Sequence, residues 1–442
     1  MLRLLVLFAG MAAFSKQLMK QNIFRVLLSL AIAAVALLRA ENLSRVVNRA
    51  TPEILVREAL EQNPELNFYA AGIAAAKGGL KTAGTIRNPE FTTQAGYKNT
   101  HDNSGGPSGD GAAWSLSVNQ TFEYPGRIAL RKAIAQGDIE LAELHFAQFQ
   151  LTLAARVRTL AYSIVIAQKR SAATREIADR FQALTDVLAQ REPAGVTPVL
   201  EARIIDANAL TLRRQEREAG VAVKNAVVEL NQLRGRPMTA PLAISGSQPE
   251  FVQVSLQTLL DAARKNAFDI RIREAEFAQQ GFRVSLSKNE RYPAIAVGPF
   301  FSQENAADKE TQAGIGISVP LPFWDRNVGN IQTSKAREQQ ARASLLTTDR
   351  EVERRVAQSA TILQAKREEI EKWQADTIAK FRDAAELADR NYRLGGVPIS
   401  IYVETQKQYL EVLGAVHEMK KDALQAAQEL EILTGLKLYK SE

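Results

Sequence analysis

The sequence predicts a mixed α+β membrane protein in which one unit of helices and strands occurs twice. Each half opens with a helix-like segment that runs to a proline, Pro89 in the first half and Pro293 in the second. Two segments of alternating polar and apolar residues follow each proline, with the length at which tilted strands cross a bilayer. Long proline-free stretches with heptad spacing come next, and they indicate helices packed side by side.

This pattern divides the chain into five parts. We expect a signal peptide at 1–40, a first repeat at 41–236, a linker at 237–253, a second repeat at 254–436 and a short tail at 437–442.

The first forty residues have the layout of a secretory signal peptide. A basic segment at 19–25 precedes an apolar run at 26–38, and a small residue, Ala40, follows. The apolar run is short for a membrane span, so we expect cleavage near Ala40, with a membrane anchor as the alternative. The basic segment also fits a translation start at Met19.

The formal charge of +7 comes mostly from this leader, which carries five Lys or Arg residues and no acid, so that +2 remains without it. No basic stripe with interleaved aromatic residues follows, and we expect no nucleic-acid partner. The chain has no cysteine, so a secreted form is held together by packing and oligomerisation. After the leader, no apolar run is long enough for a transmembrane helix.

The strand segments form two predicted β-hairpins, at 88–124 and 293–323. A Gly-, Ser- and Asp-rich loop is expected at 101–111 in the first hairpin, and a polar loop at 305–310 in the second. Both hairpins end in a cluster of proline and aromatic residues. Such residues suit a membrane interface, and an ordinary buried aromatic cluster is the alternative; the candidates are Tyr124, Phe323 and Trp324.

Each hairpin leads into a long helix and an antiparallel return helix. We expect the long helices at 128–190 and 328–394, and the return helices at 198–235 and 398–434. Heptad spacing over this length is typical of coiled-coil-like packing, and sixty-odd residues form a rod of about 95 Å.

The predicted strands number four in each chain, and four strands cannot close a barrel across a membrane. The open edges would leave backbone groups unpaired in lipid. Three chains supply twelve strands, an even number that suits a water-filled barrel. We therefore expect a trimeric 12-stranded β-barrel continued by a long α-helical coiled-coil barrel, made from an internally duplicated chain.

The order of elements, its repetition, Asn88-Pro89 and the Asn-Tyr-Arg-Leu-Gly segment at 391–395 resemble TolC-like outer-membrane factors. Within that family the chain is most similar to the CzcC/CusC-like branch that serves heavy-metal efflux. The resemblance covers residues 51–436. It implies a homotrimer in the outer membrane of a Gram-negative bacterium, with a long periplasmic extension that docks onto a periplasmic adaptor and an inner-membrane RND pump and passively exports heavy-metal cations.

The family narrows its tube at the periplasmic tip with acidic side chains. The resemblance places Glu201 and Glu404 there as candidate gate residues, and a ring of carboxylates would favour cations. A solvated helix face is the alternative for both. Ile401 and Val397 stand where the best-known members carry an acidic and a basic residue, so a salt-bridge lock is not expected. The hairpin tips that would meet the adaptor contain Gly195, Val196, Gly395, Gly396 and Val397.

No catalytic, cofactor-binding or metal site is expected. The chain has three histidines in unrelated segments and lacks Walker, dinucleotide and Gly-x-Ser-x-Gly patterns. His101 with Asp102 lies in a polar loop, which is a surface feature more readily than a metal site. Two other functions remain open: an outer-membrane duct for drugs or secreted polypeptides, and a periplasmic coiled-coil scaffold without a pore.

Overall fold

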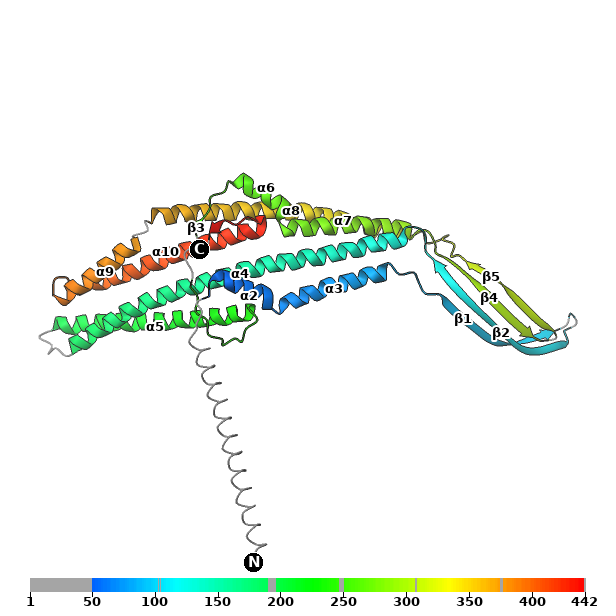
Figure 1. Ribbon diagram of the computed structural model, residues 1–442, viewed down its shortest axis with the longest axis horizontal. Helices are drawn as coiled ribbons and strands as arrows, with labels where there is room; N and C mark the ends of the chain where they lie inside the picture. The colour runs from blue at the N-terminus through cyan, green and yellow to red at the C-terminus, as the bar shows by residue number, and fades with distance from the viewer. Residues whose placement is uncertain are drawn as a thin grey trace, which may run out of the picture.

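A computed structural model describes residues 50–440, except 102, 104, 190–195, 246–249, 307 and 374–376. The expected signal peptide at 1–40 and the tip residue Gly195 lie outside the described residues. The molecule is elongated, with helices running lengthwise and the two β-hairpins at one end (Figure 1).

The first half contains four helices and two strands of the described fold: α2 (Pro52–Gln62), α3 (Glu65–Ala83), β1 (Glu90–His101), β2 (Pro107–Phe122), α4 (Arg127–Ala189) and α5 (Val196–Leu233). The second half repeats this order between two short strands: β3 (Glu250–Phe251), α6 (Leu256–Asn266), α7 (Phe268–Asn289), β4 (Ile295–Asn305), β5 (Lys309–Ser318), α8 (Val328–Lys372), α9 (Thr377–Arg393), α10 (Ile399–Thr434) and β6 (Tyr439–Lys440). Helix and strand thus combine in each half, as the mixed fold class predicts.

The helix before each hairpin is divided, whereas the sequence indicated one helix running to the proline. Pro64 lies between α2 and α3, and Asn63 before it is extended, with φ −64° and ψ 124°. A proline disfavours helical geometry in its predecessor, which explains this break. The second half breaks at Ala267, with φ −60° and ψ 119°, although no proline is present there.

The expected helix at 328–394 is two helices, α8 and α9, so that expectation was wrong. α8 ends at Lys372, since Trp373 has φ −80° and ψ 88°. Proline and glycine do not occur at this break. The heptad column passes from Ile370 to the polar Thr377, and a helix is held mainly by the packing of its apolar face.

The hairpins differ from the expected boundaries at their ends. β2 begins at Pro107, so part of the expected loop at 101–111 is strand. β5 ends at Ser318, before the expected end at residue 323. Pro320 follows closely and has no N–H to donate to a ladder, which accounts for the early end.

The two hairpins form one antiparallel sheet in the order β1-β2-β4-β5. Its inner neighbours, β2 and β4, come from different halves of the chain, and β1 and β5 are its edges. A second, two-stranded sheet joins β3 to β6 near the middle of the helical region.

Four apolar clusters hold the described part of the helical region, and the smallest joins α4 and α7 around Leu144, Ile272 and Ala275. Another joins α2, α4 and α5 around Leu55, Val157 and Leu230, and one joins α6, α8 and α10 around Val356 and Leu430. The remaining cluster, near the hairpin tips, brings α4, α5, α9 and α10 together. Among the described helices, none has the length and apolarity that a membrane span requires.

Candidate functional site

The four-stranded sheet has one polar and one apolar face. The register aligns Gln94, Ser115, Ser302 and Gln312 in one row across all four strands. The next row on the other face aligns Thr93, Leu116, Phe301 and Ala313. Side chains alternate between faces along a strand, so these rows represent opposite sides of the sheet.

In the single chain the apolar face of the sheet is exposed. Its most exposed members are β-branched or aromatic residues with exposed fractions of 66–75%: Phe91, Tyr97, Ile315 and Ile317. An apolar patch of this extent is typical of a surface that contacts lipid or another protein.

The expected interface aromatics lie at the helical end of the sheet. Tyr124 stacks on Tyr292 of the other half, with ring centroids 4.3 Å apart. Phe323 and Trp324 make an edge contact at 6.1 Å, and Trp324 is 96% exposed.

A second aromatic group, which the sequence analysis missed, lies on the apolar face toward the hairpin loops. Trp114 contacts Phe301 at 5.3 Å, and Tyr97 lies in the adjacent part of β1. The alternation of polar and apolar residues around Trp114 could have indicated that its side chain lies on the apolar side of a strand. The pairing register of β2 with β1 and β4 is what assigns Trp114 to the apolar face of the sheet. Ten residues separate Trp114 from Tyr124, which for a strand tilted by 35–45° corresponds to about 25 Å, close to the apolar band of a membrane barrel.

Charges on the polar face gather near the loops. Lys98 on β1 forms ion pairs with Glu304 on β4 and, at 3.5 Å, with Glu310 on β5. One ammonium group thus connects three strands on the polar side of the sheet.

At the opposite end of the molecule, Glu201 on α5 lies beside the tip of the second helix hairpin, where α9 turns into α10. The Tyr392 hydroxyl on α9 donates a hydrogen bond to a Glu201 carboxylate oxygen at 3.5 Å. Both residues line a cavity of about 630 Å³ with the expected tip residues Gly395, Gly396 and Val397.

The other tip residues are placed differently. Glu404 on α10 is exposed and accepts a hydrogen bond from Gln408 at 3.0 Å, so it does not join Glu201. Val196 is the first residue of α5. The Tyr392 ring stacks on buried Tyr402, which contacts Phe181, and this aromatic group joins the two halves behind the tip.

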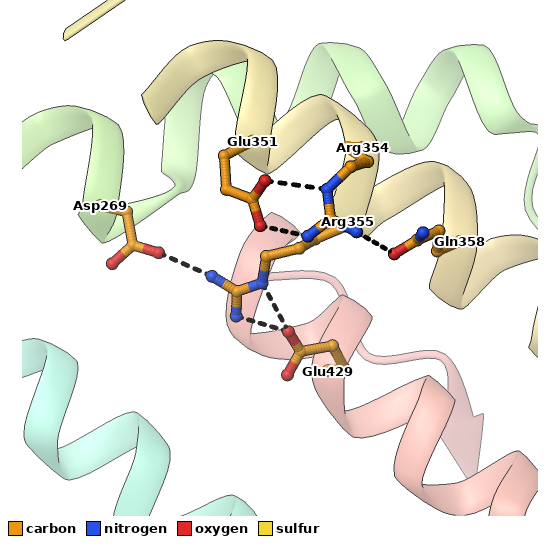
Figure 2. A network of polar contacts seen from close by, with 6 residues as sticks. All are labelled: Asp269, Glu351, Arg354, Arg355, Gln358 and Glu429. Atoms are coloured by element: carbon orange, nitrogen blue, oxygen red, sulfur yellow. Dashed lines mark hydrogen bonds and ion pairs between the residues drawn. The ribbon is translucent and has the colours of Figure 1, made fainter. Parts of the chain in front are cut away.

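Figure 2 shows an ion-pair network that joins α7, α8 and α10. Arg355 on α8 contacts Asp269 on α7 at 3.0 Å and donates through Nε to Glu429 on α10 at 3.0 Å. Gln148 on α4 donates to the same Asp269 carboxylate at 2.6 Å. Burial opposes the charge of Arg355, yet the hydrogen bond to Glu429 and the two carboxylates raise its pKa overall.

A second network connects the halves in a more buried place. Arg158 on α4 contacts Glu53 on α2 at 3.0 Å and Glu431 on α10 at 3.4 Å. Arg158 and Glu431 are both nearly buried, so the pair fixes α10 against α4.

The described residues contain no group of three or more His, Cys, Asp or Glu side chains arranged to hold a metal ion. His417 is buried on α10, where burial first, and then the nearby cations Lys169, Lys420 and Arg170, lower its pKa to about 4. Arg158 and Arg355 connect packed helices and His417 lies buried on α10 in its neutral form, so these titratable groups are structural.

Comparisons with known proteins agree with this architecture. The family model described as outer membrane efflux protein matches residues 55–236 and again 259–436. The cobalt-zinc-cadmium resistance protein CzcC of Cupriavidus metallidurans is 23% identical over 380 residues, covering 83% of this chain and 87% of that one. The nickel-cobalt-cadmium resistance protein NccC of Alcaligenes xylosoxydans xylosoxydans is 24% identical over 310 residues, covering 66% of each.

Among solved structures, a crystal structure of CusC superposes with a TM-score of 0.67 at 15% identity, covering 87% of this chain and 91% of that chain. The resemblance inferred from the repeated pattern is thereby confirmed. With two matches that together span most of its length, the chain belongs to the outer membrane efflux protein family of non-enzymatic transport channels, in the branch with the metal-resistance proteins.

Proposed function

We propose that the protein is the outer-membrane channel of a tripartite efflux system and that it exports heavy-metal cations. The names of its relatives support the cargo, since CzcC is a cobalt-zinc-cadmium resistance protein and NccC a nickel-cobalt-cadmium resistance protein. The proposed partners are a periplasmic adaptor and an inner-membrane pump of the RND class. The channel is passive, and the pump supplies the energy.

The observation that carries the proposal is the four-stranded sheet with two faces and two free edges. Its apolar face suits lipid and its polar face suits water, but open edges are unfavourable in a bilayer. A homotrimer removes them by forming a twelve-stranded barrel in the outer membrane of a Gram-negative bacterium. The helical region then extends into the periplasm.

The aromatic residues set the depth of the barrel in this proposal. Tyr124, Phe323 and Trp324 form the periplasmic belt, and Trp114 with Phe301 lies in the outer belt. Tyr and Trp suit these levels because their rings combine apolar and polar parts.

The hairpin tips form the periplasmic entrance. Glu201 and Glu404 are the proposed gate residues, each presented three times in the trimer, where a carboxylate ring favours cations. Contact with Tyr392 restrains Glu201, whereas the partner of Glu404 within the described residues, Gln408, lies on its own helix. The adaptor would dock at Gly195, Val196, Gly395, Gly396 and Val397.

Membrane fractionation and native mass of the detergent-solubilised protein test this architecture. We expect an outer-membrane trimer, and a soluble monomer or dimer would contradict the channel. Quenching of tryptophan fluorescence by brominated lipids then measures how deep each tryptophan lies in the bilayer. The chain has three tryptophans, so single-tryptophan variants are easily made. Trp114 and Trp324 should be quenched, and Trp373, in the helical region, should not.

The cargo is tested in cells that lack the protein. We expect greater accumulation of cobalt, zinc or cadmium, reversed by the intact gene, with unchanged accumulation of hydrophobic drugs. The opposite pattern would assign the channel to drug export. In planar bilayers, Glu404→Gln should reduce the preference for cations over anions, and Glu411→Gln, further along α10, serves as control.

A further inference from the structure

A cavity of about 350 Å³ lies among three long helices, α4, α5 and α10, in the part of the helical region away from the strands (Figure 1). α4 packs against both of the other helices. Because α4 and α5 belong to the first half of the chain and α10 to the second, the cavity lies at the junction between the halves. Small ligands occupy cavities of roughly 300–1,000 Å³, and this one is at the lower end of that range.

Part of the cavity lining is apolar. Ile177 and Phe181 of α4 and Leu212 of α5 line it, and all three are buried members of one apolar cluster. Leu410 of α10 packs against the same cluster and continues the lining. Side chains packed in this way keep a fixed shape, so the apolar part of a ligand would meet a preformed surface.

Hydrogen-bond acceptors lie beside the apolar lining. Gln406 of α10 is 1% exposed, and its amide nitrogen donates to the Ala385 carbonyl of α9 at 2.7 Å. The Gln406 amide oxygen is buried and accepts no hydrogen bond from the residues that the structure describes. Asn208 and Thr211 of α5 also line the cavity, and each donates to a carbonyl of its own helix. A buried acceptor without a donor costs free energy, so this lining favours a ligand that carries donors.

The charged members of the lining are Arg170 of α4 and Lys407 and Glu411 of α10. Within the described part of the chain, none of these three side chains forms an ion pair or a hydrogen bond. The lining thus presents cations of two different helices, a carboxylate, acceptors and an apolar surface. A ligand that carries both signs of charge would pair all of these groups.

We propose that this cavity binds a zwitterion with an apolar side chain, as in a free aromatic amino acid. The carboxylate of the ligand contacts Arg170 and Lys407. Its ammonium group contacts the Gln406 oxygen and Glu411, and its apolar side chain lies on Phe181. A ligand with a single charge would leave one sign of the lining unpaired, which is unfavourable for groups that binding removes from water. The site lies within one chain and is separate from the proposed export of metals.

The ligand would connect the two helix hairpins of the chain. Its contacts come from α4 and α10, which belong to different halves, and α5 borders the same cavity. A ligand that binds the folded chain alone adds stability by mass action. We therefore expect the unfolding temperature of the protein to rise with the concentration of the ligand.

Calorimetric titration of the full-length, detergent-solubilised protein tests the site with three probes. L-phenylalanine carries both charges, its amide lacks the carboxylate, and 3-phenylpropionate lacks the ammonium group. We expect saturable binding of one L-phenylalanine per chain, and binding at least about tenfold weaker for either probe with a single charge. Equal binding of 3-phenylpropionate would overturn the zwitterion in favour of an amphiphilic anion, and equal binding of the amide would overturn it in favour of an amphiphilic cation. Absence of L-phenylalanine binding would overturn the site itself.

Variants then locate the bound probe. Arg170→Gln should weaken L-phenylalanine binding about tenfold and leave binding of the amide no weaker, since the amide has no carboxylate. Lys169→Gln is the matched control, because Lys169 is exposed beside Arg170 but is not part of the lining. Gln406→Met keeps the length of the side chain and removes the acceptor, so it should weaken both probes that carry an ammonium group and spare 3-phenylpropionate. Circular dichroism checks that each variant is folded, and the exposed Arg170 provides a test that does not depend on the buried Gln406. Equal effects of Arg170→Gln and Lys169→Gln would overturn the placement of the ligand in this cavity.

Discussion

In the second half of the chain α7 lies between two long helices, whereas α3, its counterpart in the first half, has α4 as its main neighbour among the described residues. Both helices precede a hairpin, yet α7 buries Ile272, Ala275 and Gln279, and α3 buries nothing. The difference follows from position, because α7 is enclosed by the junction between the halves. In the proposed trimer, such an outer helix would complete its packing against a neighbouring copy.

The same contrast occurs between two corresponding ion pairs, one in each half of the chain. Arg156 precedes the buried Val157 and pairs with Glu229 of α5, and the two side chains are 59% and 39% exposed. Arg355 precedes the buried Val356 and pairs with Glu429 of α10, but Asp269 also contacts it and its side chain is 32% exposed. The helix at the junction supplies the extra carboxylate.

The largest expected effect comes from placing a carboxylate on the two counterpart helices. Ile272→Asp puts a charge against Leu144 and should destabilise the helical region by about 3 kcal/mol or more. Phe68→Asp, at the corresponding distance from its proline, should leave single-chain folding nearly unchanged and weaken association. Circular dichroism during heating measures the first effect and native mass the second. Equal loss of helical stability in both variants would contradict the comparison.

The second-largest expected effect is a difference in stability cost between substituting Gly235 and Gly435, the glycines that end the two return helices. Gly235 and Gly435 both have positive φ, 63° and 72°. An alanine at position 435 should cost about 1 kcal/mol, since its Cβ would lie 3.6 Å from the nearest atom. Gly235→Ala should cost more, because its Cβ would lie 2.2 Å from the Gln62 carbonyl oxygen. Urea unfolding of both variants checks the order, and a reversed order would contradict it.

Acid should weaken the second half through His417. The folded-state pKa, about 4, lies below the ordinary value of 6.5. The unfolded chain therefore takes up the proton first, and stability present above pH 6.5 is lost as the pH falls toward 4. The expected slope is about 1.4 kcal/mol per pH unit.

Replacing the buried histidine by a leucine of similar size tests this dependence. His417→Leu should flatten the decline in unfolding temperature between pH 6.5 and 4.5. The exposed His145, on α4, provides the control, and His145→Leu should retain the wild-type profile. An unchanged profile in His417→Leu would assign the acid sensitivity to other groups.

The smallest expected effect is the difference in unfolding free energy between replacing Arg156 and replacing Arg355. Arg156→Met removes an exposed pair and should change the free energy of unfolding by about 0.5 kcal/mol or less. Arg355→Met leaves Asp269 and Glu429 without their shared cation and should cost about 1 kcal/mol more. Urea unfolding of the two variants measures both costs. Equal costs would show that the additional carboxylate at Arg355, that of Asp269, contributes nothing.

Much of the fold could be predicted because local rules govern it. Pro89 and Pro293 ended helical segments, alternation identified the strands, and glycines marked the ends of the return helices. The break between α8 and α9 could not be predicted in this way, since residues near Trp373 include no helix breaker.

The sequence singled out residues at the helix-hairpin tips, but their arrangement could not be predicted from it. Glu201 and Glu404 were singled out together, yet one contacts Tyr392 across the tip and the other stays on its own helix. The contact between Glu201 and Tyr392 depends on how closely α5 and α9 pack together. Residue periodicity within one helix contains no information about that packing.

The order of elements, its repetition and the two-faced strands could be predicted from the sequence, because each follows from residues near one another in the chain. Which helix faces are covered and which are open became clear from the packing of distant segments. That packing placed Arg355 between Asp269 and Glu429, and it left one face of α3 and one face of α8 exposed. The physical reason is that burial depends on a second element, brought close by the pairing of β2 with β4.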